Sequence, residues 1–273
     1  MDLGNKLPIS AIIVGLDEAH LLEGCFNGIT FCDEIIYVDL GSADNSLQIA
    51  QRYGATTRGH PLVPSGEYVV ASVHPEAKND WILFIDPDEH LDHILQEDVV
   101  RAFLERQGDS GIGSFSAPWQ FYFKGKKLHG TPWGMRRPRA FLGHRGRFSF
   151  TAETHRGRVL LQGYSEFSID SEGSIHHFWS SSWRQLISKH MRYLTTEGGS
   201  RFRRGDRISL GGVIARVPGI FWETFVRHSD LRDGPRGIGL NLLWSVYKSL
   251  ALLAVFRYQR SLGRNNDLTS ANT

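Results

Sequence analysis

The first hundred residues alternate short apolar runs with amphipathic helical segments, and few folds satisfy this alternation. The apolar runs, which have the length and composition of buried strands, cover residues 9–14, 34–39, 56–58 and 81–85. The helical patterns between and after them cover residues 18–27, 45–53, 67–77 and 92–107. Strands that alternate with helices form a parallel sheet through crossover connections. We therefore predict an α/β fold with a Rossmann-like, mostly parallel central sheet flanked by helices.

Acidic residues follow three of the predicted strands, where an open parallel sheet binds its ligands. Asp86 and Asp88 lie one residue apart, so in an extended segment both carboxylates project to the same side. Such a pair is a hard oxygen site that suits Mg²⁺ or Mn²⁺ together with substrate phosphates. The alternative is a solvated turn in which Pro87 supplies the bend. Asp17 and Asp44 each precede a predicted helix and are interpreted as caps.

The charge of the chain is nearly balanced, with 31 Lys and Arg against 29 Asp and Glu, which argues against a general nucleic-acid binder. One stretch departs from this balance. Residues 124–158 are rich in Lys and Arg and contain a single acid, Glu153. Arg136 and Arg139 in this stretch are expected to offset the negative charge of a phosphorylated ligand.

The N-terminal motifs resemble a known family. The sequence IIVGLDEAH, the loop VDLGSADN and the segment WILFIDPDE stand in the order and spacing of family 2 glycosyltransferases. The likeness is greatest to the bacterial branch that builds lipopolysaccharide core and other surface glycans. It implies a glycosyltransferase A-type fold, a nucleotide-diphosphate sugar donor with uridine as the expected base, and transfer with inversion.

The resemblance also implies roles for individual residues, carried over by position. The implied donor-binding residues are Val14, Leu16, Asp39, Asp86 and Glu89, with Arg136 and Arg139 added from the basic stretch. The implied ligands of the Mg²⁺ or Mn²⁺ ion are Asp86, Asp88 and His177. For His177, a place in the core is the alternative interpretation.

The general base that an inverting transfer requires is less well matched. Related enzymes often carry a G-x-x-H-E motif, whereas this chain has His155 followed by Arg156 at the corresponding place. Glu153 lies two residues before His155, on the same side of a strand, and is the first candidate for the catalytic base. His155 is the second candidate.

Two strongly apolar helical stretches follow, over residues 213–226 and 238–258. The second is long enough to cross a bilayer, but Asn241 and Lys248 lie within it. These helices therefore have three alternative interpretations: an interfacial membrane helix, a hairpin packed on the domain, or a homodimer interface. The family branch has a similar Asp-Gly pair, here Asp233 and Gly234, before a long apolar helix. The resemblance implies that this part holds the enzyme at the inner membrane, near a lipid-linked acceptor.

These patterns predict three segments. Residues 1–210 are expected to form the catalytic domain, residues 211–260 the apolar helices and residues 261–273 a disordered tail. The N-terminus shows no apolar segment typical of a signal peptide, and the two cysteines suit a reducing compartment. We expect a cytoplasmic protein, peripheral on the cytoplasmic face of the inner membrane.

A second function class competes with the enzyme. Arg156 in place of the expected Glu suits a non-catalytic, glycosyltransferase-like scaffold in a glycan assembly complex, whereas Asp39, Asp86 and Asp88 favour an enzyme. A dehydrogenase is disfavoured, because no G-x-G-x-x-G follows the first predicted strand.

Overall fold

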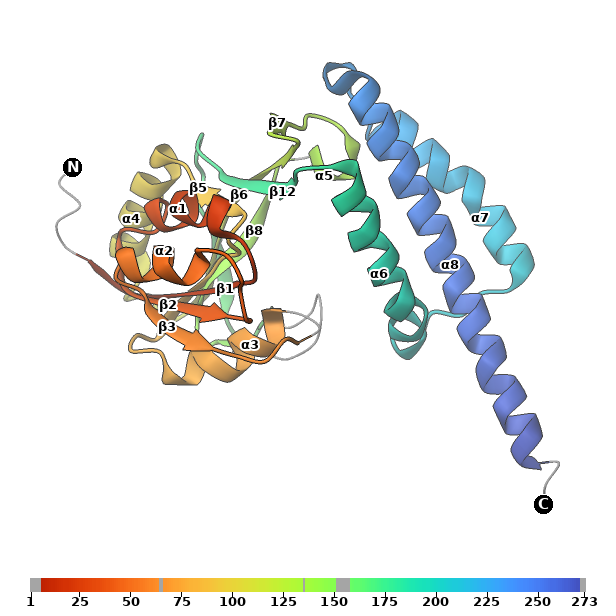
Figure 1. The fold of residues 1–273 in the computed structure, drawn as a ribbon, viewed down its shortest axis with the longest axis horizontal. Helices are drawn as coiled ribbons and strands as arrows, with labels where there is room; N and C mark the ends of the chain where they lie inside the picture. Colours follow the sequence, from red (N-terminus) through yellow and green to blue (C-terminus); the bar gives the residue numbers. More distant parts are fainter. Residues whose placement is uncertain (1–5, 64–65, 135, 151–157, 271–273) are drawn as a thin grey trace. The chain divides into compact units, whose positions relative to one another are not determined.

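A computed structural model describes residues 6–63, 66–134, 136–150 and 158–270 of the chain (Figure 1). Its strands are β1 (Leu7–Gly15), β2 (Cys32–Asp39), β3 (Thr56–Gly59), β4 (Trp81–Phe84), β5 (Glu89–Leu91), β6 (Ile112–Phe123), β7 (Lys126–Lys127), β8 (Arg137–His144), β9 (Phe148–Phe150), β10 (Arg158–Leu160), β11 (Ser165–Ser168) and β12 (Ile175–Ser180). Its helices are α1 (Ala19–Asn27), α2 (Ser46–Arg52), α3 (Gly66–Val73), α4 (His93–Arg106), α5 (Thr131–Gly134), α6 (Trp183–Arg203), α7 (Leu210–Trp222) and α8 (Gly234–Ser270). Short 3-10 or π-helical turns are η1 (His74–Glu76), η2 (Glu223–Arg227) and η3 (Leu231–Asp233).

Strands β1 to β4 form the parallel side of one large sheet. Its order is β3-β2-β1-β4-β8-β6-β12-β5. Strand β1 pairs in parallel with β2 and with β4, and β2 pairs in parallel with β3. Strand β8 joins antiparallel to both β4 and β6. The predicted α/β fold with a Rossmann-like sheet flanked by helices is confirmed. Antiparallel pairings extend this sheet at β8, β7 and β12, whereas β11 pairs in parallel with β6.

Both faces of β1 are buried, which explains its unbroken apolar sequence. Ile9, Ala11 and Ile13 belong to a core that includes residues of α1, α2 and α4, whereas Ile12 belongs to a second core that includes residues of α3. Successive side chains of a strand point to opposite faces, so each set needs its own covering layer. Figure 1 shows α1 and α2 on one side of β1 to β3 and α3 on the other.

The chain forms two compact units. The first comprises residues 1–120 and 136–178, and the second comprises residues 121–135 and 179–273. The first unit holds the parallel strands, and the second holds the helices from α5 to α8. Compact units and functional domains are different divisions of a chain, so the catalytic boundary at residue 210 stays a prediction.

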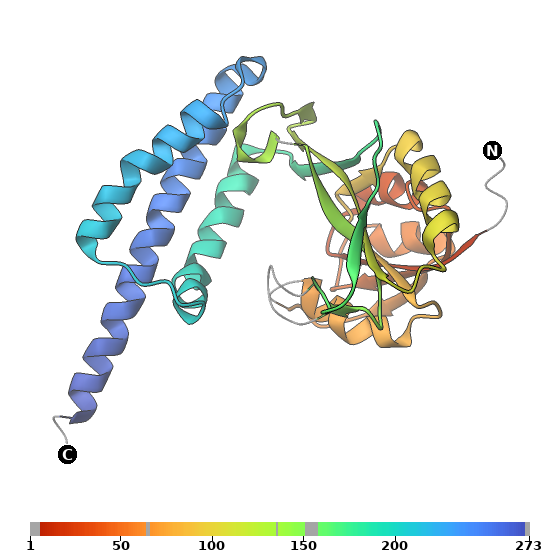
Figure 2. The ribbon, with the colours of Figure 1, turned by 180° about the vertical axis from the view of Figure 1, so that it is seen from behind.

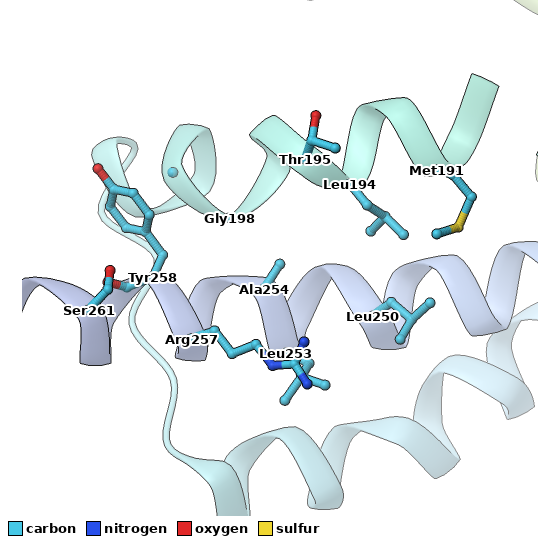
Figure 3. Close-up of a pocket in the computed structure, with 11 residues that line it drawn as sticks. Met191, Leu194, Thr195, Gly198, Leu250, Leu253, Ala254, Arg257, Tyr258 and Ser261 are labelled. Carbon is cyan, nitrogen blue, oxygen red and sulfur yellow. The ribbon is translucent and has the colours of Figure 1, made fainter. Parts of the chain in front are cut away.

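Three long helices dominate the second unit, and α8 lies between α6 and α7 (Figures 1 and 2). Helix α6 approaches α8 closely at Gly198, where a Cβ atom would come within 2.6 Å of the Ala254 carbonyl oxygen. An open groove of about 540 Å³ runs along this contact, and Figure 3 shows Met191 and Leu194 of α6 beside Leu250 of α8. Helix α8 continues to Ser270, into the segment predicted to be disordered.

A buried aspartate fixes the turn that precedes α8. The Asp233 carboxylate accepts hydrogen bonds from the backbone N–H groups of His129, at 3.0 Å, and Gly130, at 2.7 Å. The following residue, Gly234, has φ of +54°, a conformation that favours glycine. The Asp-Gly pair therefore joins the loop before α5 to the start of α8.

Candidate metal and donor site

Two loops interlock at the carboxyl ends of β1 and β2. The Asp17 carboxylate accepts a hydrogen bond from the Ala43 backbone N–H at 2.7 Å. In return, the Asp44 carboxylate accepts one from the backbone N–H of Ala19, the first residue of α1, at 3.0 Å. The interpretation of Asp17 as the cap of its own following helix was wrong, because its donor lies in the opposite loop. The Asp44 carboxylate does accept a hydrogen bond at the start of its own following helix, from the Ser46 backbone N–H at 2.9 Å, in addition to the bond from Ala19.

Asp39 ends β2 at this edge of the sheet. Its carboxylate accepts hydrogen bonds from the backbone N–H groups of Gly41, at 3.2 Å, and Ser42, at 3.1 and 3.2 Å. Gly41 has φ of +98°, which lets the loop fold back over the carboxylate. Asp39 thus holds the loop where the sequence predicts donor binding.

The other two predicted donor contacts at this edge come from β1. Val14 packs partly buried against the core on the α3 side of the sheet, and Leu16 is exposed just beyond the strand. The parallel pairing of β1 and β2 places Gly15 opposite Asp39, so the ends of both strands lie side by side. The structure therefore brings Val14, Leu16 and Asp39 to one edge of the sheet.

The acidic segment after β4 is a tight turn rather than the extended segment assumed from the sequence. The Glu89 backbone N–H donates to the Asp86 carbonyl oxygen at 3.0 Å. The Glu89 carboxylate accepts a hydrogen bond from the Asp86 backbone N–H at 2.9 Å. Pro87 at the second position of the turn favours this bend. Asp86 is exposed and Glu89 is buried, and the extended conformation expected for residues 86–88 was wrong because this segment is a turn.

Strand β12 brings His177 to this turn. Its antiparallel pairing with β5 places His177 directly opposite Glu89. The Phe178 backbone N–H also donates to the Asp88 carbonyl oxygen at 2.7 Å, which fixes the register. The His177 Nε2 atom lies 3.2 Å from a carboxylate oxygen of Asp88, and its Nδ1 atom lies 3.7 Å from one of Glu89.

Asp88, Glu89 and His177 can therefore hold a metal ion. One ligand atom from each residue lies within 4.8 Å of the others. Two carboxylates and one imidazole suit a divalent cation such as Mn²⁺ or Mg²⁺, whose remaining positions water or phosphate oxygens can fill. Of the predicted ligands, the structure gathers Asp88 and His177, and Glu89 takes the place expected for Asp86.

Two titratable groups near the turn, Cys25 and His90, have shifted pKa values. The pKa of the Cys25 thiol lies well above its usual value, because the thiol is buried and because Glu89, Asp86 and Asp88 add negative charge nearby. The pKa of His90 is lowered, chiefly by burial. The thiol and the His90 imidazole are therefore neutral near pH 7, so neither group offsets the carboxylates. A divalent cation held by Asp88, Glu89 and His177 would add positive charge at this turn.

The two predicted arginines differ in their surroundings. The Arg139 guanidinium stacks over the Trp119 ring, 5.0 Å from its centroid, and the Trp119 ring lies 5.7 Å from that of His177. Arg136 instead donates to the carbonyl oxygens of Ser171 and Gly173, at 2.5 and 2.6 Å. Trp119 thus lies between Arg139 and His177, one of the candidate metal ligands. Arg136 instead binds the backbone of the loop that contains Ser171 and Gly173.

Sequence reasoning missed part of this site. The sequence predicts that Glu89 binds the donor, whereas the structure places it with the candidate metal ligands. Its position three residues after Asp86 is compatible with the turn that brings it there. Trp119 was not selected, and no local motif singles it out. The candidate bases Glu153 and His155 lie outside the described residues.

Both the amino-acid sequence and the fold resemble known proteins. No family model matches the chain. Curated relatives nevertheless share one class of name. An uncharacterized glycosyltransferase of Rickettsia prowazekii is 23% identical and matches 97% of this chain and 91% of its own length. One from Rickettsia bellii is 36% identical over 104 residues, which are 37% of this chain and 34% of that protein.

A relative with a more specific name also spans nearly the whole chain. The lipopolysaccharide core biosynthesis glycosyltransferase LpsC of Rhizobium meliloti is 26% identical, with 96% of both chains covered. Among solved structures, glucosyl-3-phosphoglycerate synthase from Mycobacterium tuberculosis, in complex with Mn²⁺, UDP-glucose and phosphoglyceric acid, is 15% identical with a TM-score of 0.46. That match covers 71% of this chain and 78% of the other. The predicted resemblance to bacterial glycosyltransferases is confirmed by the curated relatives.

Proposed function

We propose that this protein is an inverting, metal-assisted glycosyltransferase that uses a nucleotide-diphosphate sugar, with UDP as the expected nucleotide. The observation that carries the proposal is the cluster of Asp88, Glu89 and His177 at the carboxyl end of β4. Curated relatives of nearly full length that are named glycosyltransferases support the same class.

The chemistry of the site suits a diphosphate leaving group. Breaking the bond between sugar and diphosphate leaves negative charge on the departing oxygens. Asp88, Glu89 and His177 would hold a divalent cation, which would supply positive charge that stabilises the leaving group. Asp39, Val14 and Leu16 would bind the nucleoside at the neighbouring strand ends, and Arg139 would add positive charge near the metal.

The acceptor must lose a proton as its hydroxyl attacks the anomeric carbon. We propose Glu153 as the base that takes this proton, with His155 as the alternative. We propose a growing surface glycan, such as a lipid-linked lipopolysaccharide core, as the acceptor. The name of LpsC, which refers to lipopolysaccharide core biosynthesis, supports this class. We place the enzyme on the cytoplasmic face of the inner membrane.

The second unit is proposed to hold the enzyme at that membrane. Among the described residues, one segment, Leu231–Leu262, is apolar and long enough to cross a bilayer by length and composition alone. A third of its most apolar window is buried against the rest of the protein. Membrane contact is therefore proposed for these helices, with a homodimer interface as the competing use of the same apolar surface.

Titration calorimetry with UDP tests the donor site. UDP is added to the full-length protein with Mn²⁺ and again with a chelator, for the wild type, Asp88→Asn and the surface control Glu105→Gln. We expect Mn²⁺-dependent binding that Asp88→Asn abolishes and Glu105→Gln leaves intact. Binding that survives both chelation and Asp88→Asn would contradict the proposed metal site.

Two further results would redirect the proposal. If UDP does not bind but another nucleoside diphosphate binds in the same metal-dependent way, the expected uridine is wrong and the reaction class stands. If no nucleoside diphosphate binds, the non-catalytic scaffold becomes the better function.

A further inference from the structure

Helix α7 is apolar in sequence, yet most of its residues are exposed. Arg216 is the only charged residue between Leu210 and Trp222, and of the thirteen residues of the helix only Val213 is buried. Ile214 is 66% exposed and Trp222 is 67% exposed. A helix of this composition is normally buried, so its exposed surface marks a site of interaction.

The exposed apolar residues share one side of the helix. Leu210, Ile214, Pro218 and Trp222 recur every four residues, and Val226 continues the series into η2. Residues four apart lie above one another on a helix surface. The opposite side packs through Val213 and Ile220 against Leu252, Val255 and Phe256 of α8. The inner side of α7 is therefore covered by α8, whereas its outer side is exposed.

The unit that carries α7 is strongly basic. Of the chain's 31 Lys and Arg residues, 18 lie in the second unit, which has 6 of the 29 Asp and Glu residues. The first unit has the remaining 13 basic and 23 acidic residues, so the two units have net charges of opposite sign. Arg216 and Arg227 lie exposed on α7 and η2 themselves. An apolar face with flanking cations and Trp222 near its end matches an anionic bilayer surface.

We propose that the outer side of α7 and η2 lies flat in the headgroup region of an anionic phospholipid bilayer. The apolar face, defined as Leu210, Ile214, Ala215, Pro218, Trp222 and Val226, enters the boundary between headgroups and acyl chains. Arg216 and Arg227 contact the phosphate groups. This inference refines the proposed membrane association by naming its surface and its lipid class.

The same packing argues against α8 as a membrane span. Helix α8 lies between α6 and α7, and close contact at Gly198 holds α6 along it (Figures 2 and 3). If α8 crossed the bilayer with its neighbours in place, α6 would take its charged residues into the hydrocarbon. These are Arg184, Lys189, Arg192, Glu197, Arg201 and Arg203. Such charges are strongly disfavoured there, so the assembled helices suit the surface and not the interior.

Vesicle sedimentation with the full-length protein tests this surface. Binding is measured to vesicles of phosphatidylcholine alone and to vesicles with 30 to 40% (about one third) phosphatidylglycerol. The test variant is the double change Ile214→Ser and Trp222→Ser. Its matched control is Leu62→Ser, which alters a residue that is 70% exposed in the first unit. We expect binding to anionic vesicles that falls about tenfold or more in the double variant and is unchanged in Leu62→Ser.

Charge reversal and a fluorescent label test whether vesicle binding depends on the α7 surface or only on the net charge of the protein. Arg216→Glu with Arg227→Glu should weaken binding by more than about tenfold, whereas Lys124→Glu with Lys126→Glu, which changes net charge equally, should have a smaller effect. Cys25 and Cys32 are buried, so a polarity-sensitive dye can be attached selectively at Ala215→Cys. Its emission should shift to the blue on anionic vesicles, and a dye at Ile94→Cys should not respond.

Three outcomes would overturn the proposal. The first is equal binding to neutral and anionic vesicles. The second is binding to which the α7 variants make no difference. The third is a wild-type dimer in light scattering that Ile214→Ser with Trp222→Ser converts to a monomer, without vesicle binding in either form, because α7 would then be a subunit interface. UDP binding is measured in parallel, so failure at the membrane is distinguishable from failure of the donor site.

Discussion

Replacing Glu89 by Gln should stabilise the metal-free protein and weaken its response to metal. In the wild type, the carboxylates of Asp88 and Glu89 both have oxygens in the cluster, and their side chains are 20% and 3% exposed. Without a cation, these two like charges repel each other in a poorly solvated place. Glutamine keeps an oxygen that can accept the hydrogen bond from the Asp86 backbone N–H but loses the charge. The variant therefore removes repulsion with little change of shape.

The size of both effects follows from the geometry. The cluster oxygens lie no more than 4.8 Å apart, and two unit charges at that distance repel by about 3.5 kcal/mol at an effective dielectric constant of about 20. With partial screening at Asp88, we expect a gain of about 2 to 3 kcal/mol, or roughly 4 to 12 °C in Tm. Mn²⁺ at about 100 times the wild-type Kd stabilises the wild type by about 2.7 kcal/mol. A 100-fold loss of affinity would reduce this to about 0.4 kcal/mol.

Thermal unfolding with chelator and with Mn²⁺ measures both quantities on the same samples. The buffer and its pH are the same in both scans. Glu105→Gln, a surface change, should alter neither quantity. The reasoning is refuted if Glu89→Gln lowers the Tm of the metal-free protein, or if the Mn²⁺-dependent gain remains equal to that of the wild type.

Three further predictions concern individual groups in the interior of the protein: Gly15, Asp233 and His190. Gly15→Ala would place a Cβ atom 2.7 Å from the Tyr37 hydroxyl, so we expect urea unfolding to show a loss of about 1 to 3 kcal/mol. Adding Tyr37→Phe should recover much of that loss, and no recovery would mean that another contact is responsible. Asp233→Ala should destabilise the protein by about 2 to 5 kcal/mol, because two backbone N–H groups lose their acceptor. Asp233→Asn keeps an acceptor and should cost less, and equal losses would contradict this account. Burial lowers the pKa of His190, so the unfolded chain binds this proton more readily and the free energy of unfolding should fall as pH drops below about 6.5. His190→Gln should reduce that pH dependence, and an unchanged slope in denaturation curves from pH 7 to pH 5 would count against it.

Local sequence patterns predicted the parallel half of the sheet well. The apolar runs that became β1, β2 and β4 are buried on both faces, and such strands need no partner information to be recognised. The helix after Asp92 begins as predicted, and the Asp92 side chain accepts a hydrogen bond from the Leu95 backbone N–H at 2.9 Å. Helix caps and apolar runs involve residues that are close together in the chain, so they can be recognised from the sequence alone.

The same local reasoning failed where loops cross. Asp17 has the position of an ordinary cap, yet its carboxylate binds the Ala43 backbone N–H of the opposite loop. Asp44 binds the Ser46 backbone N–H of its own helix but also that of Ala19 in α1. The Asp86 turn likewise depends on a hydrogen bond to the buried Glu89 carboxylate. A carboxylate can accept from any donor that the fold brings near, so residue type and spacing alone leave its partner open.

The apolar periodicity and the order of strands and helices are local properties of the chain, so they predict the class of fold and the acidic residues at the strand ends. The contact between His177 and Asp88, which are 89 residues apart in sequence, exists only in the folded chain. That contact depends on the antiparallel register of β12 on β5, which is a long-range pairing. The exposure of α7 was likewise decided in three dimensions. An apolar helix has the same sequence whether its outer side is buried or bare, and only the packing of α8 against its inner side distinguishes the two.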